Sequence, residues 1–493
     1  MKVLLLYPEF PDTFWSFKHA LKFIHKKASL PPLGLLTVAA MLPTVWEKRL
    51  VDVNVRKLRP ADLAWADVVF ISAMIAQETS ARELIRRCRA AGRKIVAGGP
   101  LFTLGHEQFA EVDHFVLNEA EVTLPEFLQD FERGAARRVY ASTDLPDVGL
   151  SPAPLWELAD LRRYASMSVQ FSRGCPFDCE FCNITAMFGR RPRIKSAAQV
   201  IAELDGLRRI GWNGSVFFVD DNFIGNKTAL KEDLLPALIQ WQKGGRSAPF
   251  FTEASINLAD DQELMRLMVQ AGFNQVFVGI ETPEEAGLAE CHKRQNQKRD
   301  LIADVKRIQR AGLEVQGGFI VGFDSDSSSI FARQREFIQK SGIVTAMVGQ
   351  LQAIPGTKLY KRLKSEGRLI GRTSGNNLDG TINLVPRMNR EKLREGYRNL
   401  VARLYAPGPY YQRIRTFLRE YKNPVVSGSL NWRSFMAFFR ACLRLGVFGS
   451  ERFHYWGLLC WTSFHRPTLV PLAVTFSIYG HHFRKTCRTL DIR

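Results

Sequence analysis

Three cysteines that fall within eight residues constrain this chain more than any other feature of its sequence. Cys175, Cys179 and Cys182 stand in the segment FSRGCPFDCEFCN with the spacing C-x3-C-x2-C. A cubane 4Fe–4S cluster binds thiolates, usually four, and the neighbouring sequence offers no fourth, so one iron is left open to a small molecule. The alternative is a zinc site, but structural zinc usually takes four ligands, often as two close pairs. The odd set of three therefore favours the iron–sulfur cluster.

Length and cysteine usage indicate a large protein of the reducing cytoplasm. The chain has 493 residues, enough for about two to four domains. The cysteines outside the motif are spaced irregularly, which does not indicate a disulfide framework, and a reduced cluster favours a reducing compartment. The N-terminal MKVLLLYPEF has an apolar run too short for a signal peptide and predicts a buried first strand. The remaining cysteines are Cys88, Cys291, Cys442, Cys460 and Cys487.

Residues 1–145 alternate short apolar strands with helical stretches, which predicts a doubly wound, flavodoxin-like parallel sheet. The expected strands are 2–8, 51–55, 68–74, 94–100 and 114–120. Such sheets bind ligands at the carboxyl ends of their strands, and small residues there let a bulky ligand approach the backbone. The residues expected at these ends are Ser72, Met74, Gly98, Gly99 and Glu119.

A proline-rich linker over 146–165 leads to a second alternating region over 166–370. Six strand candidates there, each followed by an amphipathic helix, predict a partial (β/α)6 barrel with its active site at the carboxyl ends of the strands. The strand candidates are 167–173, 215–221, 250–256, 275–281, 315–322 and 346–352. The polar residues expected at the strand ends are Asp220, Asp221, Asn222, Glu253, Ser255 and Glu281. Residues 371–493 predict a basic, helical C-terminal domain.

The cysteine motif with its preceding Arg173 and Gly174 resembles the radical S-adenosylmethionine (radical SAM) superfamily. The resemblance implies that SAM chelates the open iron and is cleaved to a 5′-deoxyadenosyl radical. It also implies cofactor-binding roles at the barrel's strand ends, among them Glu253 and Ser255. Phe181 and the pair Gly318 and Ile320 would then flank the adenine, the segment Asp220–Asn222 would meet the ammonium of SAM, and Glu281 would bind the ribose.

The first region resembles the cobalamin-binding domain that precedes many radical SAM modules. The resemblance rests on the segment LPPLGLLTVAAMLP and on the phrases ADVVFISAM and GGP. Cobalamin domains often carry Asp-x-His-x-x-Gly, whose histidine binds cobalt, but here Asp52 and Asn54 stand without that histidine. We therefore expect cobalamin to bind base-off with no histidine ligand. The alternative is a flavodoxin-like sheet that has lost its ligand, since a fold alone does not establish function. The C-terminal region resembles an uncharacterised domain found on cobalamin-dependent radical SAM proteins.

Together these resemblances imply a cobalamin-dependent radical SAM methyltransferase, similar to hopanoid C-2 methylases and related lipid- or pigment-modifying enzymes. Methylcobalamin would deliver a methyl group to an unactivated substrate carbon, with flavodoxin or ferredoxin as electron donor. The alternative is a radical cyclase or rearrangement enzyme without net methyl transfer. A tRNA methylthiotransferase and a nucleic-acid partner are not expected, because the chain shows no extra N-terminal cysteine triad and no separate RNA-binding module. Cys291 is a speculative hydrogen or proton donor, with an ordinary helical cysteine as the alternative.

The net charge of +19, from 68 basic and 49 acidic residues, suggests an anionic partner. From residue 431 onward, the sequence contains nine Lys or Arg, two acidic residues and many aromatic residues. This mixture suits an anionic membrane surface. No apolar run is long enough to span a bilayer, so we expect peripheral attachment on the cytoplasmic side, with a helical domain packed on the body as the alternative. The residues expected at the membrane are Trp432, Arg433, Phe435, Phe438, Phe439, Arg440, Arg444, Arg452, Trp456 and Trp461.

Overall fold

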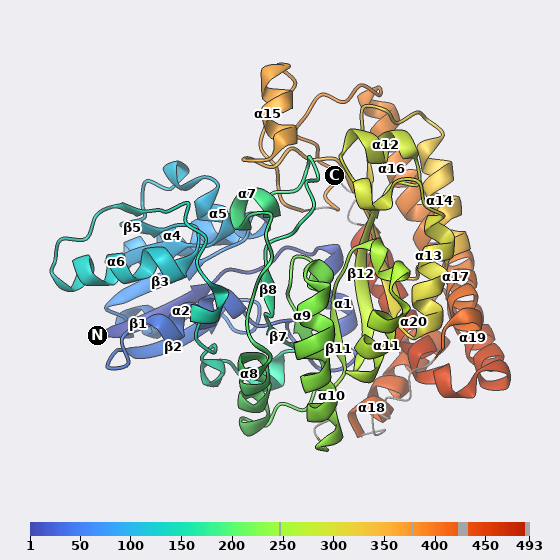
Figure 1. Cartoon of the computed structure of the whole chain (residues 1–493), viewed down its shortest axis with the longest axis horizontal. Helices are drawn as coiled ribbons and strands as arrows, with labels where there is room; N and C mark the ends of the chain where they lie inside the picture. The colour runs from blue at the N-terminus through green and yellow to red at the C-terminus, as the bar shows by residue number, and fades with distance from the viewer. Residues whose placement is uncertain (246–247, 377, 423–431, 489–493) are drawn as a thin grey trace.

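The computed structural model describes the chain except residues 246–247, 377, 423–431 and 489–493, and it does not describe the side chains of residues 432–434. The described structure contains two parallel six-stranded sheets, a small two-stranded ribbon and a C-terminal group of helices (Figure 1). The predicted α/β class and the helical C-terminal region are therefore confirmed.

The N-terminal sheet has the strand order β2-β1-β3-β4-β5-β6, with all neighbours parallel. Alternate residues of β1 face opposite sides: Leu4 and Leu6 pack with α3, α4 and α5, whereas Val3 and Leu5 pack with α2 and α6. Helices thus cover both faces, as predicted for a doubly wound sheet. The strands are β1 Lys2–Tyr7, β2 Glu47–Asp52, β3 Val68–Ser72, β4 Lys94–Gly98, β5 His114–Val116 and β6 Val139–Tyr140. The helices are α2 Leu33–Met41, α3 Pro60–Trp65, α4 Glu78–Ala90, α5 Pro100–Thr103 and α6 Ala120–Glu132.

The strand predicted over 51–55 is wrong in its position, because β2 begins at Glu47 and ends at Asp52. The Asp52 carboxylate accepts hydrogen bonds from the backbone N–H of Asn54 at 2.9 Å and from its side-chain amide at 2.7 Å. Such a side-chain turn offers the backbone an alternative to the strand ladder. The chain therefore turns at the aspartate, and the apolar residues after it lie in the turn.

The second sheet has the order β14-β13-β12-β11-β10-β7, again with all neighbours parallel, and β14 and β7 form its edges. Its helices pack outside the strands, as expected for a partial barrel. The strands are β7 Met167–Val169, β10 Val216–Phe218, β11 Phe250–Glu253, β12 Phe273–Glu281, β13 Glu314–Val321 and β14 Ala346–Gln350. The helices are α8 Ala197–Arg209, α9 Lys227–Ala229, α10 Leu235–Lys243, α11 Gln262–Gln270, α12 Glu285–Glu290, α13 Leu301–Ala311, α14 Ile330–Ser341 and α15 Lys358–Ser365.

The C-terminal helices pack on α13 and α14 of the barrel, at the right of Figure 1. A short helix near the N-terminus, α1 Lys18–Leu21, leaves the first sheet and packs on the last helix, α20. Just before it, the ring of Phe14 stacks on that of Phe483 with centroids 4.1 Å apart and planes 5° apart. The two ends of the chain thus share one core. The C-terminal helices are α16 Arg390–Tyr405, α17 Pro407–Glu420, α18 Trp432–Ala441, α19 Arg452–His465 and α20 Val470–Arg488, with a π-helical turn over Cys442–Val447.

Candidate active site

The cysteine loop is held by a small antiparallel ribbon of β8 Ser172–Arg173 and β9 Arg193–Ile194, with α7 Ile184–Phe188 between them. Gly174 opens the loop with φ of 100°, and a Cβ there would lie 3.0 Å from the carbonyl oxygens of Phe188 and Arg191. Its backbone N–H donates to the Asp221 carboxylate at 2.7 Å. Glycine is therefore required where the chain turns into the motif.

Cys175, Cys179 and Cys182 lie on this loop as free thiols, Cys179 buried and the other two half-buried. Burial raises the pKa of all three, that of Cys182 to about 12, while the charge of Lys293 acts in the opposite direction. Among the described residues, no three His, Cys, Asp or Glu side chains converge on one ion; a cubane instead binds each thiolate at its own iron. A soft, three-thiolate set beside a lysine ammonium fits a negatively charged iron–sulfur cluster.

Asp220, Asp221 and Asn222 follow β10, where the sequence placed them. Asp220 is buried, and its two oxygens accept from the backbone N–H of Phe171 at 2.8 Å and from the Ser172 hydroxyl at 3.0 Å. This carboxylate thus braces the strand that enters the cluster loop.

Asn222 and Ser255 form a buried pair that joins the ends of β10 and β11. The Asn222 amide donates to the Ser255 hydroxyl at 3.2 Å, and its carbonyl oxygen accepts from the Ser255 backbone at 3.2 Å. The pair thus fixes two adjacent strand ends. Asp221 and Glu253 are the carboxylates in this part of the site that remain to bind a ligand.

Glu253 ends β11 and has a pKa raised to about 7, first because it is buried and then because Asp221 and Asp220 repel its charge. The pKa of Asp220 is likewise raised to about 7 by burial. A group of carboxyls that raise one another's pKa favours a bound cation. The cluster therefore fits an ammonium group.

Glu281 ends β12 with φ of 64°, a left-handed conformation that side chains other than glycine rarely adopt. Its carboxylate accepts from the Lys293 ammonium at 2.7 Å; Glu281 is buried and Lys293 is half-buried. Strained backbone at a strand end is found where a site needs a fixed side-chain direction. Sequence reasoning did not identify Lys293, since nothing in the segment ECHKRQN marks it as the partner of Glu281.

Phe181 and Ile320 lie at the edge of an apolar cluster that contains Cys291 and Phe323. Cys291 is buried, burial raises the pKa of its thiol, and its backbone oxygen accepts from the N–H of Glu180 at 3.0 Å. Its surroundings are those of a packing residue that supports the cluster loop. At Gly318, a Cβ would lie 2.7 Å from the ring of Phe277, so a side chain there would displace that ring.

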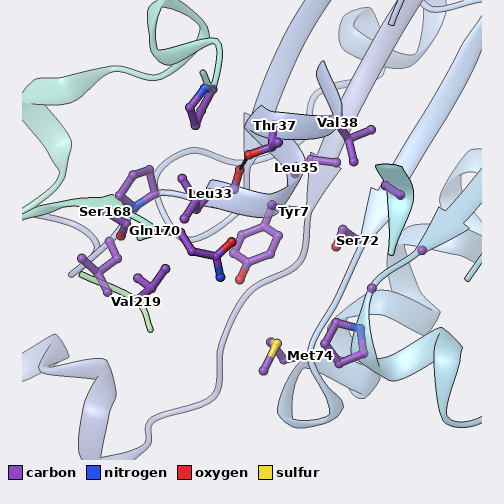
Figure 2. A pocket seen from close by; sticks show the side chains of 18 of the residues that line it. Tyr7, Leu33, Leu35, Thr37, Val38, Ser72, Met74, Ser168, Gln170 and Val219 are labelled. Atoms are coloured by element: carbon purple, nitrogen blue, oxygen red, sulfur yellow. Dashed lines mark hydrogen bonds between the residues drawn. The ribbon is translucent and has the colours of Figure 1, made fainter. Parts of the chain in front are cut away.

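A cavity of about 780 Å³ lies between the two sheets and opens toward the cluster loop. Tyr7 and Ser72 line it from the carboxyl ends of β1 and β3, and Gln170 and Asp221 line it from the barrel. Figure 2 shows Tyr7 and Gln170 pointing toward each other across it, with Met74 below them. The ligand-binding edges of both sheets therefore face one shared space.

All five residues predicted at the ends of the first sheet line this cavity. A Cβ at Gly98 would lie 2.7 Å from the Val116 oxygen, and one at Gly99, where φ is 88°, would lie 2.5 Å from the Ser72 hydroxyl. Only glycine leaves this floor open, which fits the close approach of a large, flat cofactor such as cobalamin. Asn54 also lines the cavity, but its amide is used locally, since it donates to the Pro8 oxygen at 3.0 Å and accepts from the Phe10 N–H at 2.8 Å.

Glu119 takes part in an ion-pair network that joins the first sheet to the cluster loop. Its carboxylate accepts from Arg173 at 2.5 Å and from Arg193 at 2.7 Å, and Arg173 also donates to Glu121 at 3.0 Å. Glu119 and Glu121 have 1% and 6% of their side chains exposed, so the network is shielded from solvent. The partners lie 52 to 74 residues apart in sequence, and no spacing signal could have paired them.

The C-terminal helices expose many apolar side chains between residues 435 and 464. Arg440 is directed inward, since it donates to the Phe23 oxygen at 2.7 Å, and Arg444 lies 5.2 Å from the Phe23 ring. The side chains of Trp432 and Arg433 lie outside the described residues. No helix in the described parts of the chain is long and apolar enough to cross a membrane. The exposed residues are Phe435, Phe438, Phe439, Leu443, Val447, Phe448, Phe453, Trp456 and Phe464.

Family models match three successive parts of the chain. The B12 binding domain matches residues 24–128, the radical SAM superfamily matches residues 169–331, and a domain of unknown function, DUF4070, matches residues 357–492. The first two matches contain the glycine floor of the cavity and the cysteine loop, respectively. The cofactors that follow are cobalamin, SAM and a 4Fe–4S cluster, as predicted.

Similar proteins agree with this domain order. An uncharacterised methyltransferase of Synechocystis is 42% identical over 98% of this chain and 91% of its own, and a hopanoid C-2 methylase of Rhodopseudomonas palustris is 35% identical over 82% and 77%. The radical SAM methyltransferase TsrM of Kitasatospora setae, solved with cobalamin and a [4Fe–4S] cluster, shares the fold over 100% of both chains, with a TM-score of 0.60 and 15% identity. With the cysteine loop and the glycine-floored cavity facing each other, this chain belongs to the cobalamin-dependent radical SAM methyltransferases.

Proposed function

We propose that this enzyme methylates an unactivated carbon of a hydrophobic, lipid- or pigment-like substrate. The observation that carries the proposal is the cavity of about 780 Å³ that joins the carboxyl edge of the first sheet to the cysteine loop. Its wall includes Trp15, Leu33, Leu35 and Phe70, which suit an apolar ligand. Similarity to a protein named hopanoid C-2 methylase supports the same substrate class.

In this proposal Cys175, Cys179 and Cys182 hold the cluster beside Lys293. The cluster, SAM and cobalamin supply the radical and methyl-transfer chemistry when bound. Glu253 and Asp221 would receive the SAM ammonium, because both carboxyls have raised pKa values that a cation would lower.

Other residues would hold the rest of SAM or support the site. Glu281 would bind the ribose while Lys293 fixes its direction. Phe181, Gly318 and Ile320 would flank the adenine. Asp220 would act on the loop rather than on SAM, because Phe171 and Ser172 already use its two oxygens.

On the opposite wall, Gly98, Gly99, Ser72 and Met74 would contact cobalamin. Glu119 lines the same space, but its carboxylate is engaged by two arginines, so it would act by fixing the wall. The apolar part of the wall would also limit contact with water, which would otherwise quench a substrate radical.

We also propose that the enzyme works in the cytoplasm, attached peripherally to the membrane, and receives electrons from flavodoxin or ferredoxin. Support for attachment comes from the exposed apolar side chains of α18, α19 and the turn between them, together with the basic composition of this region. An apolar substrate held in a bilayer would then be accessible to the protein.

The test uses the reconstituted full-length enzyme with lipid extract from cells that lack its gene. We expect 5′-deoxyadenosine and a product heavier by about 14 daltons, the mass added by methylation. Cys179→Ala should lose both, because two thiolates do not retain the cluster. The matched control Cys460→Ala, at an exposed cysteine, should keep both. Formation of 5′-deoxyadenosine with a cyclised product and no added mass would contradict methylation.

A further inference from the structure

A second cavity, of about 390 Å³, lies between α17 and α19, which run side by side in Figure 1. It is far from the cysteine loop in the fold and belongs to the region that matches the family model of a domain of unknown function. The side chains around it include three basic groups and no acidic one. The lining residues are Gly408, Tyr411, Gln412, Arg415, Arg419 and His454.

The two arginines of this cavity have no carboxylate partner among the residues that the structure describes. Arg415 and Arg419 lie four residues apart on α17, and neither forms a salt bridge within the described part of the chain. The Nε of Arg415 is buried without a hydrogen-bond partner. Glu420, the acid next to them in sequence, is already paired with Lys306 and Arg310 at 2.8 and 2.7 Å. Like charges at this helical spacing repel each other, so a bound anion would reduce the repulsion between the two arginines.

Neighbouring residues hold the basic groups in place. The Arg419 guanidinium lies 5.7 Å from the Trp461 ring, and the His454 ring stacks on Tyr411 at 5.9 Å. Gly457 leaves room for Arg415, since a Cβ there would lie 3.3 Å from its Nη2. The planar guanidinium groups of the two arginines match the oxygens of a phosphate group, which can accept two parallel N–H bonds from each.

Helix α19 carries an apolar face beside the cavity. Phe453, Trp456 and Phe464 recur at intervals of three and eight residues along α19, and 78%, 43% and 86% of each residue is exposed. His454 and Trp461 follow on the neighbouring stripe of the helix. Aromatic side chains that enter a membrane interface would place this cavity at the depth of the lipid phosphates.

We propose that the cavity between α17 and α19 binds the phosphate group of an anionic lipid headgroup through Arg415, Arg419 and His454. This inference rests on the proposed peripheral attachment and adds a specific anion site to it. Phosphate in solution carries the same chemistry, so the test must separate the two sources. The adjoining apolar face favours the lipid.

The test compares Arg415→Gln/Arg419→Gln with a matched control, Arg390→Gln/Arg394→Gln, which removes two exposed arginines also four residues apart on α16. Full-length holoenzymes are floated with vesicles of phosphatidylglycerol and phosphatidylcholine, and with phosphatidylcholine alone. Inorganic phosphate is titrated separately by calorimetry. We expect the cavity variant to bind anionic vesicles at least about tenfold more weakly than the control, since each lost charge-assisted hydrogen bond is worth about a factor of ten. Unchanged cluster absorbance and circular dichroism would verify folding.

The possible outcomes separate this inference from the attachment itself. Equal vesicle binding by the cavity variant, with flotation lost in Phe453→Ser/Trp456→Ser/Phe464→Ser, would overturn the cavity assignment and leave membrane attachment intact. If the cavity variant loses binding of inorganic phosphate but floats with anionic vesicles like the control, the cavity binds a soluble phosphate and the lipid source is overturned. If the wild-type protein does not float, both the attachment and the lipid assignment fail. Capture of RNA in place of vesicles, lost in the same variant, would also overturn the lipid assignment.

Discussion

The carboxyl groups of Asp220, Asp221 and Glu253 form a cluster, and their protonation depends on whether a cation is bound. Burial and mutual repulsion raise the pKa values of Asp220 and Glu253 to about 7, far above those of carboxyls in water. Without a cation, the folded protein therefore holds protons there that the unfolded chain releases near pH 4. These two groups lower the free energy of unfolding as the pH rises from about 4 to 7.

SAM binding should strengthen as the pH rises through about 7, because Glu253 then becomes the carboxylate that attracts the ammonium. Glu253→Gln should weaken binding and remove most of this pH dependence, as measured by equilibrium dialysis of SAM with reconstituted enzyme. Glu314→Gln is the matched control, since Glu314 is a buried carboxyl with a pKa of about 8 at the opposite end of the barrel strands. A pH profile that Glu253→Gln leaves unchanged would exclude this role for Glu253.

Asn54 stands at the position where many cobalamin domains have a cobalt-binding histidine. Its amide group instead forms hydrogen bonds that connect the turn after β2 to the loop after β1. Bound cobalamin in its cobalt(II) state should therefore show no nitrogen superhyperfine coupling from the protein in electron paramagnetic resonance. Clear coupling from a protein nitrogen would contradict base-off binding without histidine.

At the scale of elements, the segment between β1 and α2 is the least expected feature. It leaves the first sheet, contributes Phe14 and α1 to the core around α20, and returns. The buried His482 ring also lies within 3.0 Å of the Phe14 oxygen, which fixes the segment through its backbone. A local stretch of chain thus joins the first and last elements of the molecule.

Phe14→Ala should destabilise the protein by about 3–5 kcal/mol, because it removes a fully buried ring and leaves a cavity against Phe483. Chemical unfolding followed by circular dichroism measures this. Phe464→Ala, at a residue that is 86% exposed, should cost less than about 0.5 kcal/mol. Equal midpoints for the two variants would show that the Phe14 contact does not stabilise the fold.

At the scale of the whole molecule, Glu119 and Glu121 with Arg173 and Arg193 set the position of the cobalamin-domain sheet against the cluster loop. Because Arg173 stands two residues before Cys175, a shift in this network would move the loop relative to the opposite cavity wall. Reaction between groups held by two domains depends on distances of this kind.

Glu119→Gln should therefore uncouple the reaction: 5′-deoxyadenosine should still form while methylated product falls by about tenfold or more, since a displacement of about 1 Å can cost a hundredfold in rate. The ratio of the two products in one assay measures this. Arg299→Gln is the control, because Arg299 also pairs with two carboxylates, Asp260 and Asp304, but far from the cavity. A proportional loss of both products in Glu119→Gln would indicate simple destabilisation instead.

Local pattern was enough to predict both sheets, the glycines at the end of β4 and the cysteine loop. Alternating apolar strands and helices repeat over short distances, so their type and order can be seen in the chain itself. The strand predicted over 51–55 was misplaced because the side chain of Asp52 binds the backbone of Asn54 and ends the strand there. The apolar residues that follow Asp52 gave no sign of this turn.

The sequence by itself determined the strand-end positions of Ser72, Asp220 and Glu281, because these depend on the local periodicity of apolar residues. It also indicated the family of the enzyme, through the resemblance of the cysteine motif and of several first-domain segments to known families. Only the tertiary structure decided the partners of these residues. Glu281 meets Lys293, Asp220 supports Phe171, and Glu119 binds arginines that lie more than 50 residues away. Contacts between distant segments depend on how whole elements pack, and no local pattern records that packing.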